Sequence, residues 1–191
     1  LPQVKRAADR PRPLVVLPAI SWQGLNAVDD DFDGFVDSFP RARSLRLDRP
    51  FAGGELPLRF EAEVAPLLRY LDRERLAYDL TTDLSLARGE GPALGNAPGV
   101  AFAGSALWLP EPLLGRIRDE VEDGLRVASF GADAFRRTVR IEGDRLVAPH
   151  RRRVNAFGEI TTPLDEPTPA PLTVFEDGLG IFEGLDEFIG D

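Results

Sequence analysis

Short apolar runs alternate with amphipathic segments along most of the chain. Residues 14–20, 77–81, 100–103 and 125–130 each have the length and apolar character of a buried strand. Residues 66–75 and 113–121 lie between them and carry apolar side chains at the i, i+3, i+4 and i+7 spacing of one helix face. Because parallel strands need long crossovers, this alternation predicts an α/β three-layer sandwich with a mostly parallel central sheet.

The pattern changes after Arg136. Two short β-prone runs, 139–141 and 146–147, flank the turn signal Glu142-Gly143-Asp144, which predicts an antiparallel hairpin at the sheet edge. Residues 1–13 read as a polar N-terminal arm, and 161–171, with four prolines, as an extended strap before a last β run at 172–175. We expect 1–191 to form a single domain and, because the chain has no Met, to be a fragment of a larger protein.

Composition excludes several classes of function. The chain has 23 Lys and Arg residues against 32 Asp and Glu residues, a net charge of −9, so we expect no nucleic-acid partner. It has no Cys, which excludes disulfides, zinc thiolates, iron–sulfur clusters and cysteine nucleophiles. No apolar run is long enough to predict a membrane span.

The most specific local signal lies in residues 29–37, which read D-x-D-x-D-G-x-x-D. The alternate carboxylates of Asp29, Asp31 and Asp33 can bind one hard cation, and Gly34 after them permits a sharp turn. Phe35 could add its backbone carbonyl as a ligand, and Asp37 stands at the ninth position of the loop. The four aspartates and Phe35 predict a calcium site.

The loop departs from the EF-hand pattern at its twelfth position. Pro40 stands where an EF-hand has a bidentate Glu, so the loop is closer to the calcium loops of thrombospondin-type and dockerin repeats, and a further ligand must come from elsewhere. Asp30 lies off the alternating register and should matter less. The alternative is a solvated acidic turn without a metal.

A second concentration of polar residues follows the predicted strands. Ser105 and Ser129 stand at strand ends, where open α/β sheets bind ligands, and His150 and Asp133 could complete a serine-hydrolase set. Ser129 lacks the G-x-S-x-G elbow, so an amide or ester hydrolase is the alternative function.

Two further features at or near strand ends could bind ligands. Trp22 and Trp108 could stack on a carbohydrate or another small molecule, or close the rim of the core. The three arginines that follow His150 could hold an anion, or form a solvated face paired with carboxylates.

Three stretches carry a family resemblance: YDLTTDLSL at 78–86, GVAFAGSALWLPEPL at 99–113 and DGLRVASFGADAF at 123–135. They resemble the glutamine-amidotransferase-like domain of the large subunit of N,N-dimethylformamidase and its relatives. The resemblance implies a flavodoxin-like three-layer sandwich. It implies no retained chemistry, because the cysteine and the His-x-Glu of class I amidotransferases are missing.

The dimethylformamidase branch binds iron through two tyrosines and a glutamate. The matching positions lie near Leu109 and Arg136, whereas Tyr70 and Tyr78 are the only tyrosines and precede both strands. We therefore expect a non-catalytic binding or structural domain, stabilised by calcium. We expect it to be secreted or on the cell surface, with other domains of the same protein as partners.

Overall fold

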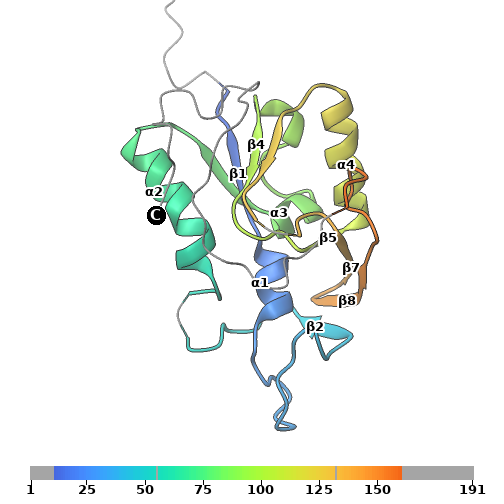
Figure 1. The fold of residues 1–191 in the computed structure, drawn as a ribbon. Helices are drawn as coiled ribbons and strands as arrows, with labels where there is room; N and C mark the ends of the chain where they lie inside the picture. The colour runs from blue at the N-terminus through green and yellow to red at the C-terminus, as the bar shows by residue number, and fades with distance from the viewer. Residues whose placement is uncertain (1–10, 55, 132, 161–191) are drawn as a thin grey trace, which may run out of the picture. The chain divides into compact units, whose positions relative to one another are not determined.

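The structure is a computed structural model that describes residues 11–54, 56–131 and 133–160. Its central feature is a parallel four-stranded sheet in the order β3-β1-β4-β6, built from β1 (Leu14–Leu17), β3 (Asp79–Thr82), β4 (Val100–Phe102) and β6 (Val127–Ser129). The four strands are those that the alternating pattern predicts, with slightly different bounds. The α/β fold with a parallel sheet is therefore confirmed (Figure 1).

Helices cover both faces of this sheet. The π-helical turn η2 (Phe60–Val64) and α2 (Ala65–Arg73) lie on one side, and α3 (Asp83–Arg88) and α4 (Glu111–Glu122) on the other (Figure 1). Successive side chains of β1 point to opposite faces of the sheet. Leu14 and Val16 pack in the cluster that contains α3 and α4, while Val15 packs with Val64 on the other face. Pro66 falls in the first turn of α2, where its missing N–H costs nothing.

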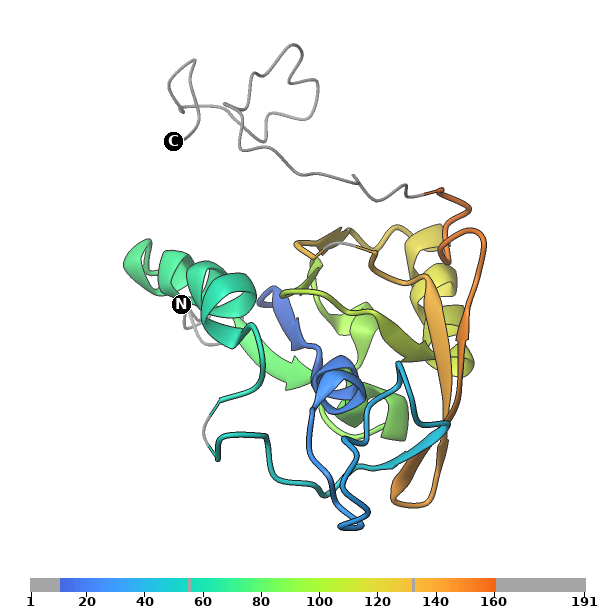
Figure 2. The same ribbon diagram turned by 60° about the horizontal axis from the view of Figure 1, so that its bottom comes forward.

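A second sheet has the order β2-β8-β7-β5 and contains β2 (Ser44–Arg46), β5 (Trp108–Pro110), β7 (Arg137–Glu142) and β8 (Arg145–Arg151). The predicted hairpin is its β7–β8 pair, which turns at Gly143 with φ 61° (Figure 2). The hairpin does not extend the parallel sheet. It pairs instead with β2 on one side and with β5, in parallel, on the other.

The strand predicted over residues 14–20 is too long. It ends at Leu17, and Pro18 precedes α1 (Ala19–Leu25), a helix that the apolar run concealed. Helix α1 packs Ile20 among the buried side chains of the second sheet, including Trp108. Gly24 permits this approach, since a Cβ there would lie 2.8 Å from the Phe39 ring and 3.0 Å from the Trp108 ring.

Several expectations fall on residues that the structure does not describe. These are residues 1–10 of the N-terminal arm, the Pro-rich strap at 161–171 and the β run at 172–175. Within the described part, Pro13 accepts a hydrogen bond from the Asp79 N–H, which joins the end of the arm to β3. Among the described helices, none has the length and apolar character needed to cross a bilayer.

Candidate functional site

The acidic loop at residues 29–37 connects α1 to the segment before β2. Its ends are closed by a bridge in which the Asp37 N–H donates to the Val28 carbonyl at 2.8 Å. Within the loop, carboxylate oxygens of Asp29, Asp31 and Asp37 all lie within 4.8 Å of one another. Two oxygens on opposite sides of a calcium ion, each about 2.4 Å from it, are about 4.8 Å apart. The spacing therefore fits one shared cation.

Backbone N–H groups turn these carboxylates inward. The Asp33 N–H donates to Oδ1 of Asp29 and to Oδ1 of Asp31, both at 3.2 Å, and the Gly34 N–H donates to Asp29 Oδ2 at 2.9 Å. Phe32 and Gly34 have positive φ angles of 62° and 90°, which bring these amides to the carboxylates. A carboxylate has about four lone-pair sites, so these bonds leave room for a cation.

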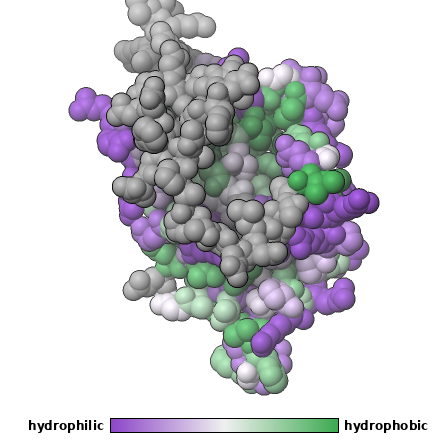
Figure 3. Space-filling view, viewed as in Figure 1, coloured by the Kyte–Doolittle hydropathy of each residue, from purple (hydrophilic) through white to green (hydrophobic). Residues whose placement is uncertain are grey.

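Asp33 stands apart from the cluster. Asp33 Oδ1 accepts the Phe35 N–H at 2.8 Å, so this carboxylate closes a local turn, and Asp33 is not grouped with the other three. The rings at the loop tip face solvent, with Phe32 90% exposed and Phe35 66% exposed. In the space-filling view the projecting loop at the bottom accordingly shows hydrophobic beside hydrophilic surface (Figure 3).

Asp30 lies outside the cluster, as expected, but its side chain turns toward Asp37 and Arg49. Burial raises the pKa of Asp30, and the neighbouring Asp37 carboxylate raises it further despite the opposing charge of Arg49. The pKa of Asp37 is lowered, mainly because its Oδ2 accepts a hydrogen bond from the Asp30 N–H at 3.0 Å. A hydrogen bond with the Asp30 carboxyl lowers it further. Asp30 thus keeps its proton more readily than the carboxylate beside it.

Arg49 ties the base of the loop to α1. Its guanidinium is buried and donates to the Asp37 carbonyl and the Gln23 carbonyl, both at 2.7 Å, while Gln23 returns a bond to the Arg49 carbonyl at 3.0 Å. Burial lowers the pKa of Arg49. The hydrogen bonds of this arginine therefore go to backbone carbonyls rather than to the clustered carboxylates.

The strand end at Gly104 and Ser105 is closed by other groups. Ser105 is buried, and its N–H donates to Glu63 Oε2 at 3.0 Å, while Glu63 Oε1 accepts from Arg59 Nη1 at 3.0 Å. Gly131 packs directly on this backbone, because a Cβ there would overlap the Gly104 carbonyl and the Ser105 Cα. A substrate carbonyl would find the Ser105 amide already occupied.

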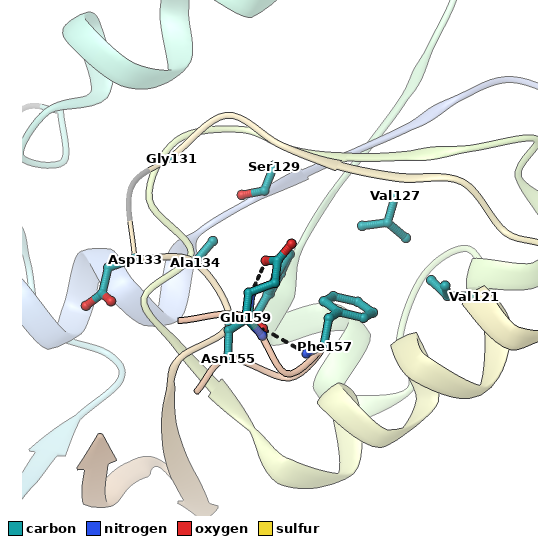
Figure 4. Close-up of a pocket in the computed structure, with 10 residues that line it drawn as sticks. Val121, Val127, Ser129, Gly131, Asp133, Ala134, Asn155, Phe157 and Glu159 are labelled. Atoms are coloured by element: carbon teal, nitrogen blue, oxygen red, sulfur yellow. Dashed lines mark hydrogen bonds between the residues drawn. The ribbon is translucent and has the colours of Figure 1, made fainter. Parts of the chain in front are cut away.

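Of the other proposed hydrolase residues, Ser129 and Asp133 line the same pocket, and Asp133 is paired with arginines. Ser129 is exposed at the end of β6 and lines a pocket (Figure 4). Asp133 binds Arg137 at 2.8 Å and Arg136 at 3.3 Å; burial raises its pKa, but Arg137 and Arg151 lower it below the usual value. The Arg151 side chain points toward Asp133, at 3.8 Å. Its neighbour in β8, His150, is exposed.

The predicted ligand-stacking residues differ in accessibility. Trp108 lies within β5, is 4% exposed and packs against Phe39 and the Arg137 guanidinium, so of its two predicted roles the one in the core describes it. Trp22 lies in α1 and is partly buried between the rings of Phe51 and Phe60.

Two of the three arginines after His150 lie beside carboxylates. Arg151 lies near Asp133, as described above, and Arg152 Nη2 lies 2.6 Å from Glu111 Oε1. Of the two interpretations of this basic run, pairing with carboxylates describes these two residues.

Sequence reasoning missed Asp83. This residue begins α3, is fully buried, and accepts the Ile20 N–H at 3.0 Å through Oδ1, while its Oδ2 has no hydrogen-bond partner. Burial raises the pKa of Asp83 to about 8, although the N–H groups of Ile20, Leu84 and Ala19 oppose the shift. The available signal was the helix-start pattern, since Thr82 caps α3 by accepting the Ser85 N–H at 3.0 Å.

Comparisons with known proteins add no relative. No protein-family model matches the chain. No curated protein matches its sequence. The resemblance to the amidotransferase-like domain of N,N-dimethylformamidase therefore stays a prediction from three sequence stretches.

Proposed function

We propose that this chain is a non-catalytic, amidotransferase-like α/β domain that binds calcium in the loop at residues 29–37. The observation that carries the proposal is the convergence of Asp29, Asp31 and Asp37, whose carboxylate oxygens lie within 4.8 Å of one another. The ion would join the two ends of the loop, because Asp29 and Asp31 precede its tip and Asp37 follows it. Calcium would then brace the connection between α1 and β2.

Electrostatics favour a divalent cation over an empty loop. Carboxylates at such spacing repel one another, and no ion pair within the described ranges joins Asp29, Asp31 or Asp37 to a basic side chain.

The closed strand end supports a domain without hydrolase activity. Glu63 occupies the Ser105 N–H, and Asp133 is held by Arg136 and Arg137. An extracytoplasmic location fits a site with few protein carboxylates, since extracellular calcium modules work at about 10⁻⁴ to 10⁻³ M calcium. The domain's partners would be other domains of the same protein.

Thermal and urea unfolding with calcium or with a chelator tests the proposal. Saturating calcium should stabilise the wild-type chain by roughly 1 to 3 kcal/mol, and Asp31→Asn should remove most of this gain because it takes one charged ligand from the ion. Asp119→Asn, on the exposed face of α4, is the control and should keep the full calcium response.

The neighbouring Asp30 sharpens the test. Since its carboxyl lies outside the cluster, Asp30→Asn should keep the response to calcium that Asp31→Asn loses. A wild-type chain whose stability ignores millimolar calcium would refute the site. So would a set of loop variants that are all equally stable or more stable in chelator and in calcium, which is the behaviour of a solvated acidic turn.

A further inference from the structure

A pocket of about 520 Å³ opens where β6 ends, beside α4 (Figure 4). Small-molecule sites typically measure about 300–1,000 Å³ and occur outside the carboxyl ends of parallel strands. This pocket has the required size and position. It shares no residue with the acidic loop, so it is independent of the calcium proposal.

One wall is a turn that its own hydrogen bonds hold in place. The buried Asn155 accepts the Phe157 and Glu159 N–H groups through Oδ1, both at 2.9 Å, and its Nδ2 donates to Glu159 Oε2 at 2.6 Å. The Ala156 N–H donates to the Phe135 carbonyl at 3.0 Å, which fastens the turn to the loop after β6. The Glu159 carboxylate is therefore positioned before any ligand arrives.

The apolar part of the pocket is continuous with the core. Phe157 packs edge-on against Phe135 with ring centroids 5.8 Å apart, and Phe135 packs in the same manner on the buried Phe102 at 4.9 Å. Figure 4 shows the Phe157 ring turned toward Val121 and Val127. Phe157 is nevertheless 39% exposed, so this ring offers a ligand an apolar face.

The charge in the pocket is negative. Of the described residues that line it, Asp133 and Glu159 are acidic and none is basic. Asp133 is neutralised by arginines, and its carboxylate points away from the other lining side chains (Figure 4). The Glu159 carboxylate and the Ser129 hydroxyl both belong to side chains that line the pocket, together with the apolar Phe157 ring (Figure 4).

We propose that this pocket binds a small organic amine. The ammonium group would donate to the Glu159 carboxylate and to the Ser129 hydroxyl, and its apolar body would lie between Phe157 and Val127. An ammonium satisfies both oxygen acceptors at once, while an anion would meet the uncompensated charge of Glu159. The site is a binding site, and no reaction is required of Ser129.

Two probes of similar size and opposite charge test the ligand class: 2-phenylethylamine and 3-phenylpropionate. Calorimetric and ligand-detected NMR titrations of the full chain should show saturable binding of the amine and none of the acid. Glu159→Gln keeps an oxygen acceptor for Asn155 but loses the charge, so it should weaken amine binding about tenfold or more. Ser129→Ala should weaken it less. Glu142→Gln, on the β7–β8 hairpin, is the matched control and should bind as the wild type does.

Each variant is first compared with the wild type by its melting temperature, and titrations are run both with calcium and with chelator. Binding of the amine in both conditions would support the pocket independently of the loop. The proposal is overturned if the wild-type chain shows no saturable amine binding, if both probes bind equally, or if Glu159→Gln binds the amine as tightly as Glu142→Gln.

Discussion

Asp83 makes a sharp prediction about the pH dependence of stability. Its carboxyl is fully buried at the start of α3, Oδ1 accepts the Ile20 N–H, and Oδ2 has no hydrogen-bond partner. Its pKa is raised to about 8 in the folded chain from a usual value of 3.8. Asp83→Asn keeps the acceptor for Ile20 and replaces the titrating group with a neutral one of the same shape.

The direction and size of the change in unfolding free energy with pH follow from the two pKa values of Asp83. Below pH 3.8 both folded and unfolded chains hold the proton; between 3.8 and about 8 only the folded chain holds it. Stability is therefore lost as pH rises through this window, by up to about 1.4 kcal/mol per pH unit. From pH 5 to pH 7 the wild-type chain should lose roughly 2 to 3 kcal/mol relative to Asp83→Asn.

Urea unfolding followed by the fluorescence of Trp22 and Trp108 measures this difference, because urea leaves the ionic strength unchanged. The difference between the free energies of unfolding of the two chains should grow steadily from pH 5 to pH 7. The lowered pKa of Asp133 acts in the opposite sense and only below pH 3.8, where its stabilising ion pairs are lost as pH falls through its folded pKa. Parallel curves for the two chains from pH 5 to pH 8 would show that Asp83 is ionised in the fold, and would refute the reasoning.

Two further predictions concern glycines and serines. Gly131→Ala should destabilise the chain by about 1–3 kcal/mol, since its Cβ would overlap the Gly104 and Ser105 backbone. Gly115→Ala, in α4 with open space around it, should stabilise the chain by about 0.5–1 kcal/mol. Urea midpoints that shift in the same direction for both variants would contradict this. A fluorophosphonate probe should label neither Ser105 nor Ser129, because Ser105 is buried with its N–H on Glu63 and Asp133 is paired with arginines. Mass spectrometry of the treated protein decides this, and a labelled serine would favour the hydrolase.

The parallel sheet could be predicted from sequence because its signals are local. Each strand is a short apolar run, and α2 and α4 show a clear helical period. Helix α1 was missed because its first residues continue the apolar run of β1 through Pro18, which begins a helix as readily as it interrupts a strand. The second sheet depends on pairings between distant short strands, such as the three-residue β5 with β7, which no local pattern reveals.

The same limit applies to the candidate sites. The acidic loop was found because its residues are consecutive, and the structure groups three of its four alternate carboxylates. The strand end at Ser129 was singled out as a place for a ligand, but Phe157 and Glu159 were not, since they come from a segment that only the fold brings there. Nor does sequence show that Glu63, 42 positions before Ser105, occupies the Ser105 amide.

The pairing of β2 with β8 has a consequence for the order in which the chain folds. Ser44 lies opposite Val147, so β2 waits for a partner about 100 residues further along the chain. At a synthesis rate of about 5–20 residues per second, β2 emerges roughly 5–20 s before β8. The four strands of the parallel sheet are complete at Ser129, before β7 and β8 exist. On the ribosome, the parallel sheet is therefore free to form first, and the second sheet closes last, after the entropic cost of its longest loop has been met.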